Sequence, residues 1–382
     1  MEALNTPPAR RSGAGIFLTR IFAGVFDFTA LSHIESASDF ENFYQMKKSA
    51  PLVFSVLFVF LFQSGCVRFS ASRAGRDVST SRGGALFSQF NYERPANLTL
   101  GSNFVARTRR YELWRVAIAR AGGVVTTNTT LALDYYLPIR AKPSTDANLL
   151  PVVLILPISA GRYELESHLA RRFTKEFAVV VARRDEIPRV LKDNLTGDAV
   201  NALLRQSIID ARQIIDWVET RPELAHTKIG VLGVSQGAIR GAVLAAIDRR
   251  IRVSVLALGG GNVPYIIARS KDGALKHRGI TRRRNEHRAS HGCSLSEFEG
   301  ELRRAMTSDP LDFAPYIDRQ RTLLILGLCD SVVPFKTGWT LRRAMGKPQT
   351  IVLLGGHYTV VLYLPYIIQK SVEFFREGFN SP

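Results

Sequence analysis

Apolar and polar positions alternate with two different periods in the C-terminal two thirds of the chain. The segments 111–120 and 129–139 are rich in β-branched and aromatic residues, and a glycine-containing turn lies between them. This pattern predicts two strands of an antiparallel hairpin. Residues 151–157, PVVLILP, form a continuous apolar run, which is typical of a central parallel strand buried on both faces.

Further along the chain, apolar runs of strand length alternate with stretches that carry apolar residues at helical spacing. This alternation predicts an α/β fold whose sheet is mostly parallel and covered by helices on both faces. The expected strands are residues 178–184, 228–235, 253–260, 322–328 and 350–356, and the expected helices include 164–177, 199–221 and 236–247.

One segment, residues 261–309, interrupts this alternation between two expected strands. It is too long for a simple connection. Long insertions of this kind often form lids over a site, so we predict a helical, lid-like insertion. The alternative is a helical excursion with no role at the site.

A different apolar pattern lies between Met46 and Cys66. Two lysines precede an apolar run, residues 52–62, that a single serine interrupts, and two small residues then lead to the cysteine. A helix that spans a bilayer needs roughly 20 residues, so this run is better sized for the apolar part of a secretion signal. A buried helix and a pair of short strands are the alternatives.

The segment 46–66 resembles a bacterial lipoprotein signal, which is cut before a cysteine that carries the lipid. The position three before the cysteine is usually leucine in that pattern, and here it is Gln63. The resemblance implies a signal peptide over 46–65, a lipid on Cys66, and a membrane-anchored lipoprotein on the periplasmic side of the bacterial cell envelope. A cleaved signal without a lipid is the alternative.

The position of this signal predicts the domain organisation. Export signals begin close to the initiator methionine, so residues 1–45 are expected to be an upstream extension from a misassigned start. Residues 66–106 include the Ser-, Arg- and Gly-rich stretch 70–84 and are expected to be a tether. Residues 107–382 are expected to form one domain, with the insertion 261–309.

The net charge of the chain limits the kinds of molecule that it is expected to bind. The 382 residues carry a net charge of +18, and residues 1–65 hold five basic and five acidic residues, so the excess belongs to the rest of the chain. A basic surface favours anionic phospholipid, acidic cell-wall polymer or an acidic substrate. An arginine-rich composition without such a partner is the alternative. We expect no nucleic-acid partner, because the sequence has no helix-turn-helix, zinc-finger or RNA-binding pattern.

Three cysteines exclude a disulfide framework. If Cys66 carries a lipid, Cys293 in the insertion and Cys329 remain. In an exported protein these two could form a bridge that holds the insertion over the site. The alternative is that Cys329 is a buried small residue at the end of a strand.

The most informative motif is Gly233-Val234-Ser235-Gln236-Gly237, which lies between an expected strand and an expected helix. G-x-S-x-G in this context predicts a tight turn that projects the serine hydroxyl from the carboxyl edge of the sheet. The helix N-terminus that follows favours a developing negative charge at the same place. Ser235 is therefore the candidate nucleophile.

Two other strand ends carry the residue types that a nucleophilic serine requires, a base and an acid that orients the base. Asp330 follows the expected strand 322–328, and His357 follows the last expected strand, 350–356. The carboxyl ends of parallel strands meet at one edge of a sheet, so Ser235, Asp330 and His357 are expected to lie together.

The chain order Ser235, Asp330, His357 and the stretch D-x-x-V-P after the acid resemble the α/β-hydrolase family, over about residues 111–378. The resemblance implies an α/β-hydrolase fold and a serine hydrolase that cleaves a small-molecule or lipid ester through an acyl-enzyme, with these three residues as the catalytic triad. A serine peptidase of the prolyl-oligopeptidase type and a non-catalytic envelope binding protein on the same fold are the alternatives.

The family forms an oxyanion hole from two backbone N–H groups. The resemblance implies Gln236 as one donor and Ser159, or secondarily Ile158, as the other. The family often has His-Gly where this chain has Pro157-Ile158. The sequence has no metal-ligand spacing and no phosphate-binding glycine loop, so we expect neither a metal nor a cofactor.

Overall fold

The computed structural model describes residues 66–71, 84–121, 129–139, 149–158, 163–183, 195–271 and 280–381. Residues Gly65–Pro382 form one compact unit. The predicted upstream extension, 1–45, and the predicted signal, 46–65, lie outside the described residues.

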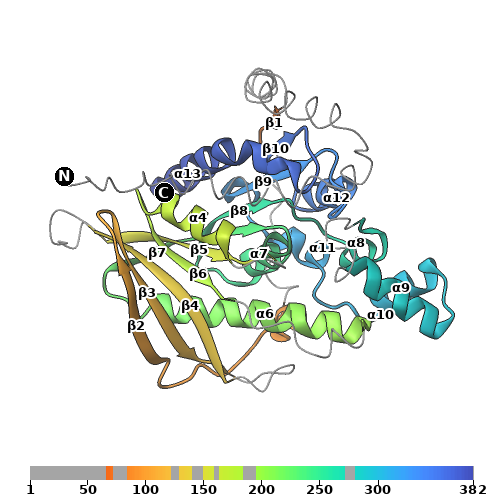
Figure 1. Cartoon of the computed structure of the whole chain (residues 1–382), viewed down its shortest axis with the longest axis horizontal. Helices are drawn as coiled ribbons and strands as arrows, with labels where there is room; N and C mark the ends of the chain where they lie inside the picture. The colour runs from red at the N-terminus through yellow and green to blue at the C-terminus, as the bar shows by residue number, and fades with distance from the viewer. Residues whose placement is uncertain are drawn as a thin grey trace, which may run out of the picture. The chain divides into compact units, whose positions relative to one another are not determined.

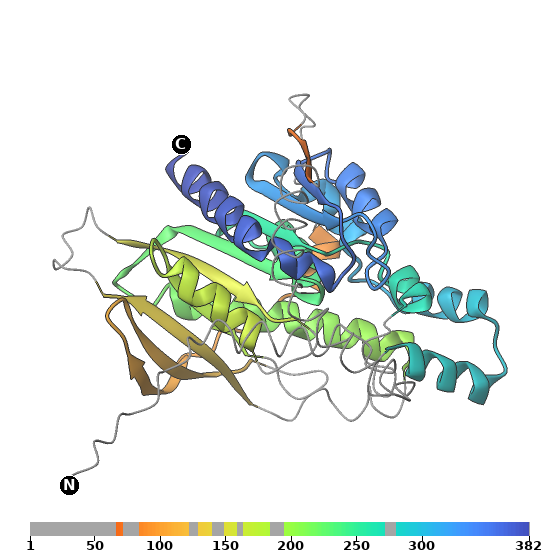
Figure 2. The same ribbon diagram turned by 45° about the horizontal axis from the view of Figure 1, so that its top comes forward.

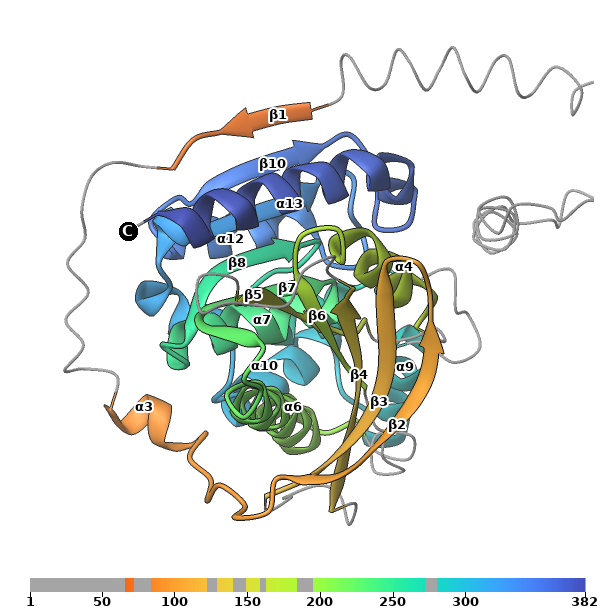
Figure 3. The ribbon, with the colours of Figure 1, turned by 90° about the vertical axis from the view of Figure 1, so that its left-hand side faces the viewer.

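One mixed sheet forms the centre of this unit (Figures 1 and 3). Its described strands are β1 (Cys66–Phe69), β2 (Thr99–Arg107), β3 (Tyr111–Ala119), β4 (Thr130–Pro138), β5 (Leu150–Leu156), β6 (Ala178–Ala182), β7 (Leu224–Val234), β8 (Ile251–Ala257), β9 (Thr322–Gly327) and β10 (Gln349–Leu353). They lie in the order β1-β10-β9-β8-β7-β5-β6-β4-β3-β2.

The pairing of the strands confirms the predicted class of fold. The neighbouring strands β10, β9, β8, β7, β5 and β6 are all parallel to one another. β3 and β4 form the predicted antiparallel hairpin, which joins the parallel strands through β6, and β2 extends it to one edge. At the opposite edge β1 pairs antiparallel with β10.

Helices cover both faces of the sheet (Figure 1). α4 (Glu164–Phe173) and α13 (Leu364–Asn380) pack on the face that includes Val153 and Ile155 of β5. α6 (Gly197–Val218) packs on the opposite face, against Val152 and Leu154. β5 is thus buried on both sides, which explains why its sequence is apolar at every position instead of alternating.

Two further helices belong to the same side as α6. α7 (Gln236–Ile247) and α12 (Phe335–Ala344) bury Ala238, Ala242 and Leu341 beside Leu256 of β8 and Leu324 of β9. Among the described residues, no helix combines the length and the apolar content that a bilayer span requires.

The predicted insertion is helical. It contains α8 (Val263–Arg269), α9 (Ile280–His291) and α10 (Leu295–Ala305), and α9 and α10 lie at one end of the unit (Figure 2). Ser294 and Glu297 form a capping box that begins α10. Phe298 and Leu302 of α10 have no exposed surface and pack in one cluster with Ile208 of α6. This packing holds α10 against the domain, and the role of the insertion as a lid stays a prediction.

The expected tether, residues 66–106, is wrong in its described parts, because these belong to the domain. β1 and β2 form the two edges of the sheet, and the short helix α3 (Gly84–Ser88) leads to Phe90, which has no exposed surface. Phe90 packs edge-to-face on Phe313, with ring centroids 5.5 Å apart. Every residue of β2 is exposed, so no apolar alternation marks this strand in the sequence.

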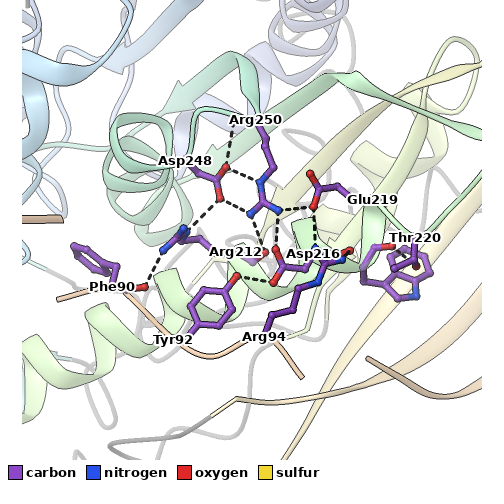
Figure 4. A network of polar contacts seen from close by, with 10 residues as sticks. Phe90, Tyr92, Arg94, Arg212, Asp216, Glu219, Thr220, Asp248 and Arg250 are labelled. Carbon is purple, nitrogen blue, oxygen red and sulfur yellow. Dashed lines mark hydrogen bonds and ion pairs between the residues drawn. The ribbon is translucent and has the colours of Figure 1, made fainter. Parts of the chain in front are cut away.

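A network of charged residues fixes the segment that follows Phe90 (Figure 4). The Tyr92 hydroxyl donates to Asp216 at 2.7 Å, and Arg94 donates to the carbonyl of Asp216 at 2.8 Å. Arg250 bridges Asp216 and Asp248, each at 2.6 Å. Burial lowers the pKa of Arg250, but the two carboxylates outweigh burial and raise this pKa overall. Because loss of one partner would leave a buried charge unpaired, the network specifies the position of this segment.

Candidate active site

Ser235 lies on the turn between β7 and α7, in a backbone conformation that few residues adopt. Its φ of 55° and ψ of −120° are unfavourable for a side chain, and such strain is characteristic of functional sites. The N–H of Ser235 donates to the carbonyl of Ala257 on β8 at 2.8 Å, and its carbonyl accepts from Ala238 on α7 at 2.9 Å. Neighbouring elements therefore hold the turn in place.

The two glycines of the motif are required by close backbone contacts on either side of Ser235. A Cβ atom on Gly233 would lie 2.3 Å from the carbonyl oxygen of Gly237. A Cβ atom on Gly237 would lie 2.4 Å from the carbonyl oxygen of Leu156 at the end of β5. Both partners are backbone atoms that cannot move aside, so only glycine fits at either position.

The structure brings the three predicted side chains together. The Oγ atom of Ser235 lies 2.9 Å from Nε2 of His357, and Nδ1 of His357 lies 2.7 Å from Oδ2 of Asp330. Asp330 follows β9 and His357 follows β10, so the residues meet at the carboxyl edge of the sheet as predicted. The side chains of His357 and Asp330 are only 9% and 2% exposed, respectively.

The environment of Asp330 fixes the orientation of its carboxylate. Its Oδ1 atom accepts hydrogen bonds from the N–H groups of Val332 and Val333, each at 2.9 Å. Its Oδ2 atom is then left to accept from Nδ1 of His357. A histidine that donates through Nδ1 presents Nε2 as an acceptor, so the arrangement can remove the proton of the Ser235 hydroxyl.

The predicted oxyanion donors have different outcomes. Gln236 is the first residue of α7, where backbone N–H groups have no acceptor within the helix, so its N–H remains a candidate. The N–H of Ile158 instead donates to Oε1 of Glu166 at 2.9 Å. Because this N–H is already engaged, Ile158 is the weaker candidate, and its role as an oxyanion donor stays a prediction. Ser159 lies outside the described residues.

Two buried charged residues, which the sequence prediction missed, hold the peptide unit between Pro157 and Ile158. Glu166 on α4 accepts from its N–H, and Arg240 on α7 donates to its carbonyl. Arg240 also donates to the carbonyl of Gln236 at 3.3 Å, which links this peptide to the first turn of α7. The second oxygen of Glu166 is buried and has no hydrogen-bond partner in the part of the chain that the structure describes.

The three cysteines lie in different parts of the fold, Cys66 on β1, Cys293 between α9 and α10, and Cys329 directly before Asp330. Cys66 begins β1, pairs with Leu353 of β10, and places Sγ 3.1 Å from the Tyr366 hydroxyl. Cys293 and Cys329 are both free thiols, so the structure contains no bridge between the insertion and the acid loop. No group of three or more potential metal ligands gathers anywhere in the described ranges.

The fold and the site together define a class. A mostly parallel sheet with helices on both faces carries a serine on a strained strand-to-helix turn, with an acid and a histidine after later strands. The chain has the α/β-hydrolase fold.

Comparisons with known proteins agree with this class. Residues 212–377 match the family described as BAAT / acyl-CoA thioester hydrolase C terminal. An acetyl xylan esterase from Paenibacillus sp. R4 is 18% identical, with a TM-score of 0.52, over 78% of this chain and 96% of that one. Acetyl xylan esterase 1 from Thermoanaerobacterium sp. JW/SL YS485 is 16% identical, with a TM-score of 0.53, over 79% and 96%. At these identities the similarity establishes the fold. No curated protein matches the sequence.

Proposed function

We propose that the protein is a serine hydrolase that cleaves carboxylic esters through an acyl-enzyme intermediate. The observation that carries this proposal is the pair of contacts from Ser235 to His357, at 2.9 Å, and from His357 to Asp330, at 2.7 Å. A nucleophile, a base within hydrogen-bond distance and an acid that orients the base are the parts that this chemistry requires.

The proposed reaction has two halves. Ser235 attacks the ester carbonyl while its proton moves to Nε2 of His357, and the N–H of Gln236 stabilises the resulting oxyanion. His357 then gives the proton to the leaving alcohol, and the acyl group stays on Ser235. In the second half His357 takes a proton from water, the hydroxide attacks the acyl group, and the carboxylic acid leaves as Ser235 regains its proton. Asp330 holds His357 in the required tautomer throughout.

Two observations bear on the substrate. The compared structures are acetyl xylan esterases, which supports an ester. The matched family is described as an acyl-CoA thioester hydrolase, which favours a thioester as the second candidate substrate. Both substrates carry a better leaving group than an amide, and both follow the same two steps at Ser235.

A panel of substrates tests the proposal. We expect the purified protein to hydrolyse p-nitrophenyl esters or acyl thioesters far faster than peptide p-nitroanilides, with a burst of the first product equal to the enzyme concentration if deacylation is slow. Acyl chains from acetyl to palmitoyl would define the acyl preference. Faster cleavage of the amides would instead support the peptidase alternative, and no turnover of any of these compounds would support a non-catalytic binding protein.

We also propose that Cys66 carries a lipid that anchors the protein to the periplasmic side of the bacterial cell envelope. The lipoprotein-like pattern of residues 46–66 and the large positive charge of residues 66–382 support this proposal. Cys66 is the first residue of the edge strand β1, so an anchor there would be joined to the domain without an intervening linker.

Replacing Cys66 with serine tests the anchor. We expect Cys66→Ser to move the protein from the membrane fraction to the soluble fraction after a wash with concentrated salt, because the sulfur that bears the lipid is lost and salt screens the remaining attraction of the basic surface to the membrane. Cys293→Ser is the matched control, since Cys293 is also a free, partly buried thiol, and this variant should stay with the membrane. If the Cys66→Ser protein remained membrane-bound, the apolar run 52–62 or the basic surface would be the attachment.

A further inference from the structure

Exposed apolar side chains gather at the edge of the sheet where Ser235, His357 and Asp330 lie. Leu328 follows β9 and is 47% exposed, Leu354 follows β10 and is 50% exposed, and Tyr358 follows His357 and is 38% exposed. The N–H of Leu328 donates to the carbonyl of Leu353 at 2.9 Å, so the loops after β9 and β10 adjoin. We call Leu328, Leu354 and Tyr358 the apolar rim.

The strand that begins at Cys66 reaches the same edge. Cys66 pairs with Leu353, the last residue of β10, and Leu353 is directly followed by Leu354 of the apolar rim. β1 and β10 lie side by side, next to α13, in Figure 3. Val67, which follows Cys66, is itself 56% exposed. A lipid on Cys66 would therefore hold the apolar rim close to the bilayer.

The charge around the apolar rim is positive. From residue 328 to residue 340, which covers the loop after β9 and the start of α12, the only acidic residue is Asp330, which is buried against His357, and the only lysine or arginine is the exposed Lys336. Two exposed cations come from outside this stretch. Lys271 donates its backbone N–H to the carbonyl of Ser331 at 2.8 Å, and Arg68 lies on β1. Exposed apolar side chains with exposed cations beside them match an anionic phospholipid surface.

We propose that the apolar rim and the cations around it are a docking face for an anionic phospholipid bilayer, which presents the Ser235 edge of the domain to the membrane. The proposal deepens the proposed function, since it implies an ester held in or at the membrane as the substrate. Docking requires neither the lipid on Cys66 nor the chemistry at Ser235, so each can be tested separately.

The test uses residues 65–382, which form one compact unit, with Cys66→Ser so that neither a lipid nor the apolar run 52–62 contributes. We expect this protein to sediment with vesicles of phosphatidylglycerol and phosphatidylethanolamine, and much less with vesicles of phosphatidylcholine alone. Added salt should weaken the binding, because it screens the cations.

Variants of single leucines locate the face. Leu328→Glu and Leu354→Glu should each weaken binding to the anionic vesicles about fivefold or more, because each replaces an apolar contact with a charge of the wrong sign. Leu100→Glu is the matched control. Leu100 is 56% exposed on β2, the opposite edge of the sheet, so this variant should bind like the parent.

Three results would overturn the proposal. They are absence of binding by the parent, equal binding by the rim variants and the parent, and an equal loss in Leu100→Glu. A dimer that Leu354→Glu dissociates, without vesicle binding, would identify a second copy as the occupant. Hydrolysis of a water-soluble ester is measured on the same parent protein. Turnover without vesicle binding would contradict only the proposed docking face. Vesicle binding without turnover would contradict only the proposed function.

Discussion

Replacing Ser235 with alanine should lower the turnover of an ester substrate by a factor on the order of 10⁴ or more, because the variant has no nucleophile. His357→Ala should cause a loss of similar size, since the serine proton then has no acceptor. The double variant should be no slower than either single variant, because the two residues act as one unit. Rates of each variant with a saturating ester measure this.

The fold should survive the Ser235 substitution. Alanine has a Cβ atom like serine, so it experiences the same strain at a φ of 55°, and the hydrogen bonds that hold the turn involve only backbone atoms. The unfolding temperature should therefore match that of the parent. If the Ser235→Ala protein had an equal unfolding temperature and retained activity, the nucleophile would be a different residue.

Asp330→Asn should reduce turnover by about 10³- to 10⁴-fold. The asparagine oxygen can still accept from Val332 and Val333, which keeps the loop in place, but its amide group then faces Nδ1 of His357 with a donor. The imidazole is driven to the tautomer whose Nε2 carries a proton and cannot accept one from Ser235. Single-variant kinetics measure the loss.

The matched control for Asp330→Asn is Asp312→Asn. Asp312 is a carboxylate that precedes β9 instead of following it, and burial followed by the charge of Asp309 raises its pKa. The substitution removes a carboxylate from the same part of the chain without touching His357, so activity should stay close to that of the parent. Full activity in Asp330→Asn, or a large loss in Asp312→Asn, would show that the acid is assigned to the wrong residue.

The elements that the sequence predicts best are those buried on both faces. The run 151–157 predicts β5 to within one residue, because every residue of the strand except Pro151 packs in one of the two apolar layers and must be apolar. β7 begins at Leu224, earlier than the predicted 228, since its exposed polar residues His226 and Thr227 interrupt the apolar pattern. β1 and β2 were missed because edge strands have one unpaired side and little buried surface to mark them.

The residues of the site also differ in how well the sequence predicts them. Ser235, Asp330 and His357 are predictable because each follows a strand with a recognisable sequence, and the topology then brings the strand ends together. Glu166 and Arg240 depend on contacts that no local pattern encodes, and Arg240 and Pro157 are 83 residues apart in the chain. The sequence does hold one signal of the role of Arg240. It is the sole charged residue in the apolar stretch 236–247, and a cation in such a helix needs buried partners.

The central claim is that Ser235 is the nucleophile of a working triad, and covalent labelling tests it most directly. A fluorophosphonate reacts with a serine only when its hydroxyl is activated, so the purified protein should gain one adduct, and peptide mass spectrometry should place it on Ser235. The adduct should be absent from Ser235→Ala and form far more slowly on His357→Ala. Absence of any adduct on the folded parent protein, or an adduct on another residue, would contradict the account.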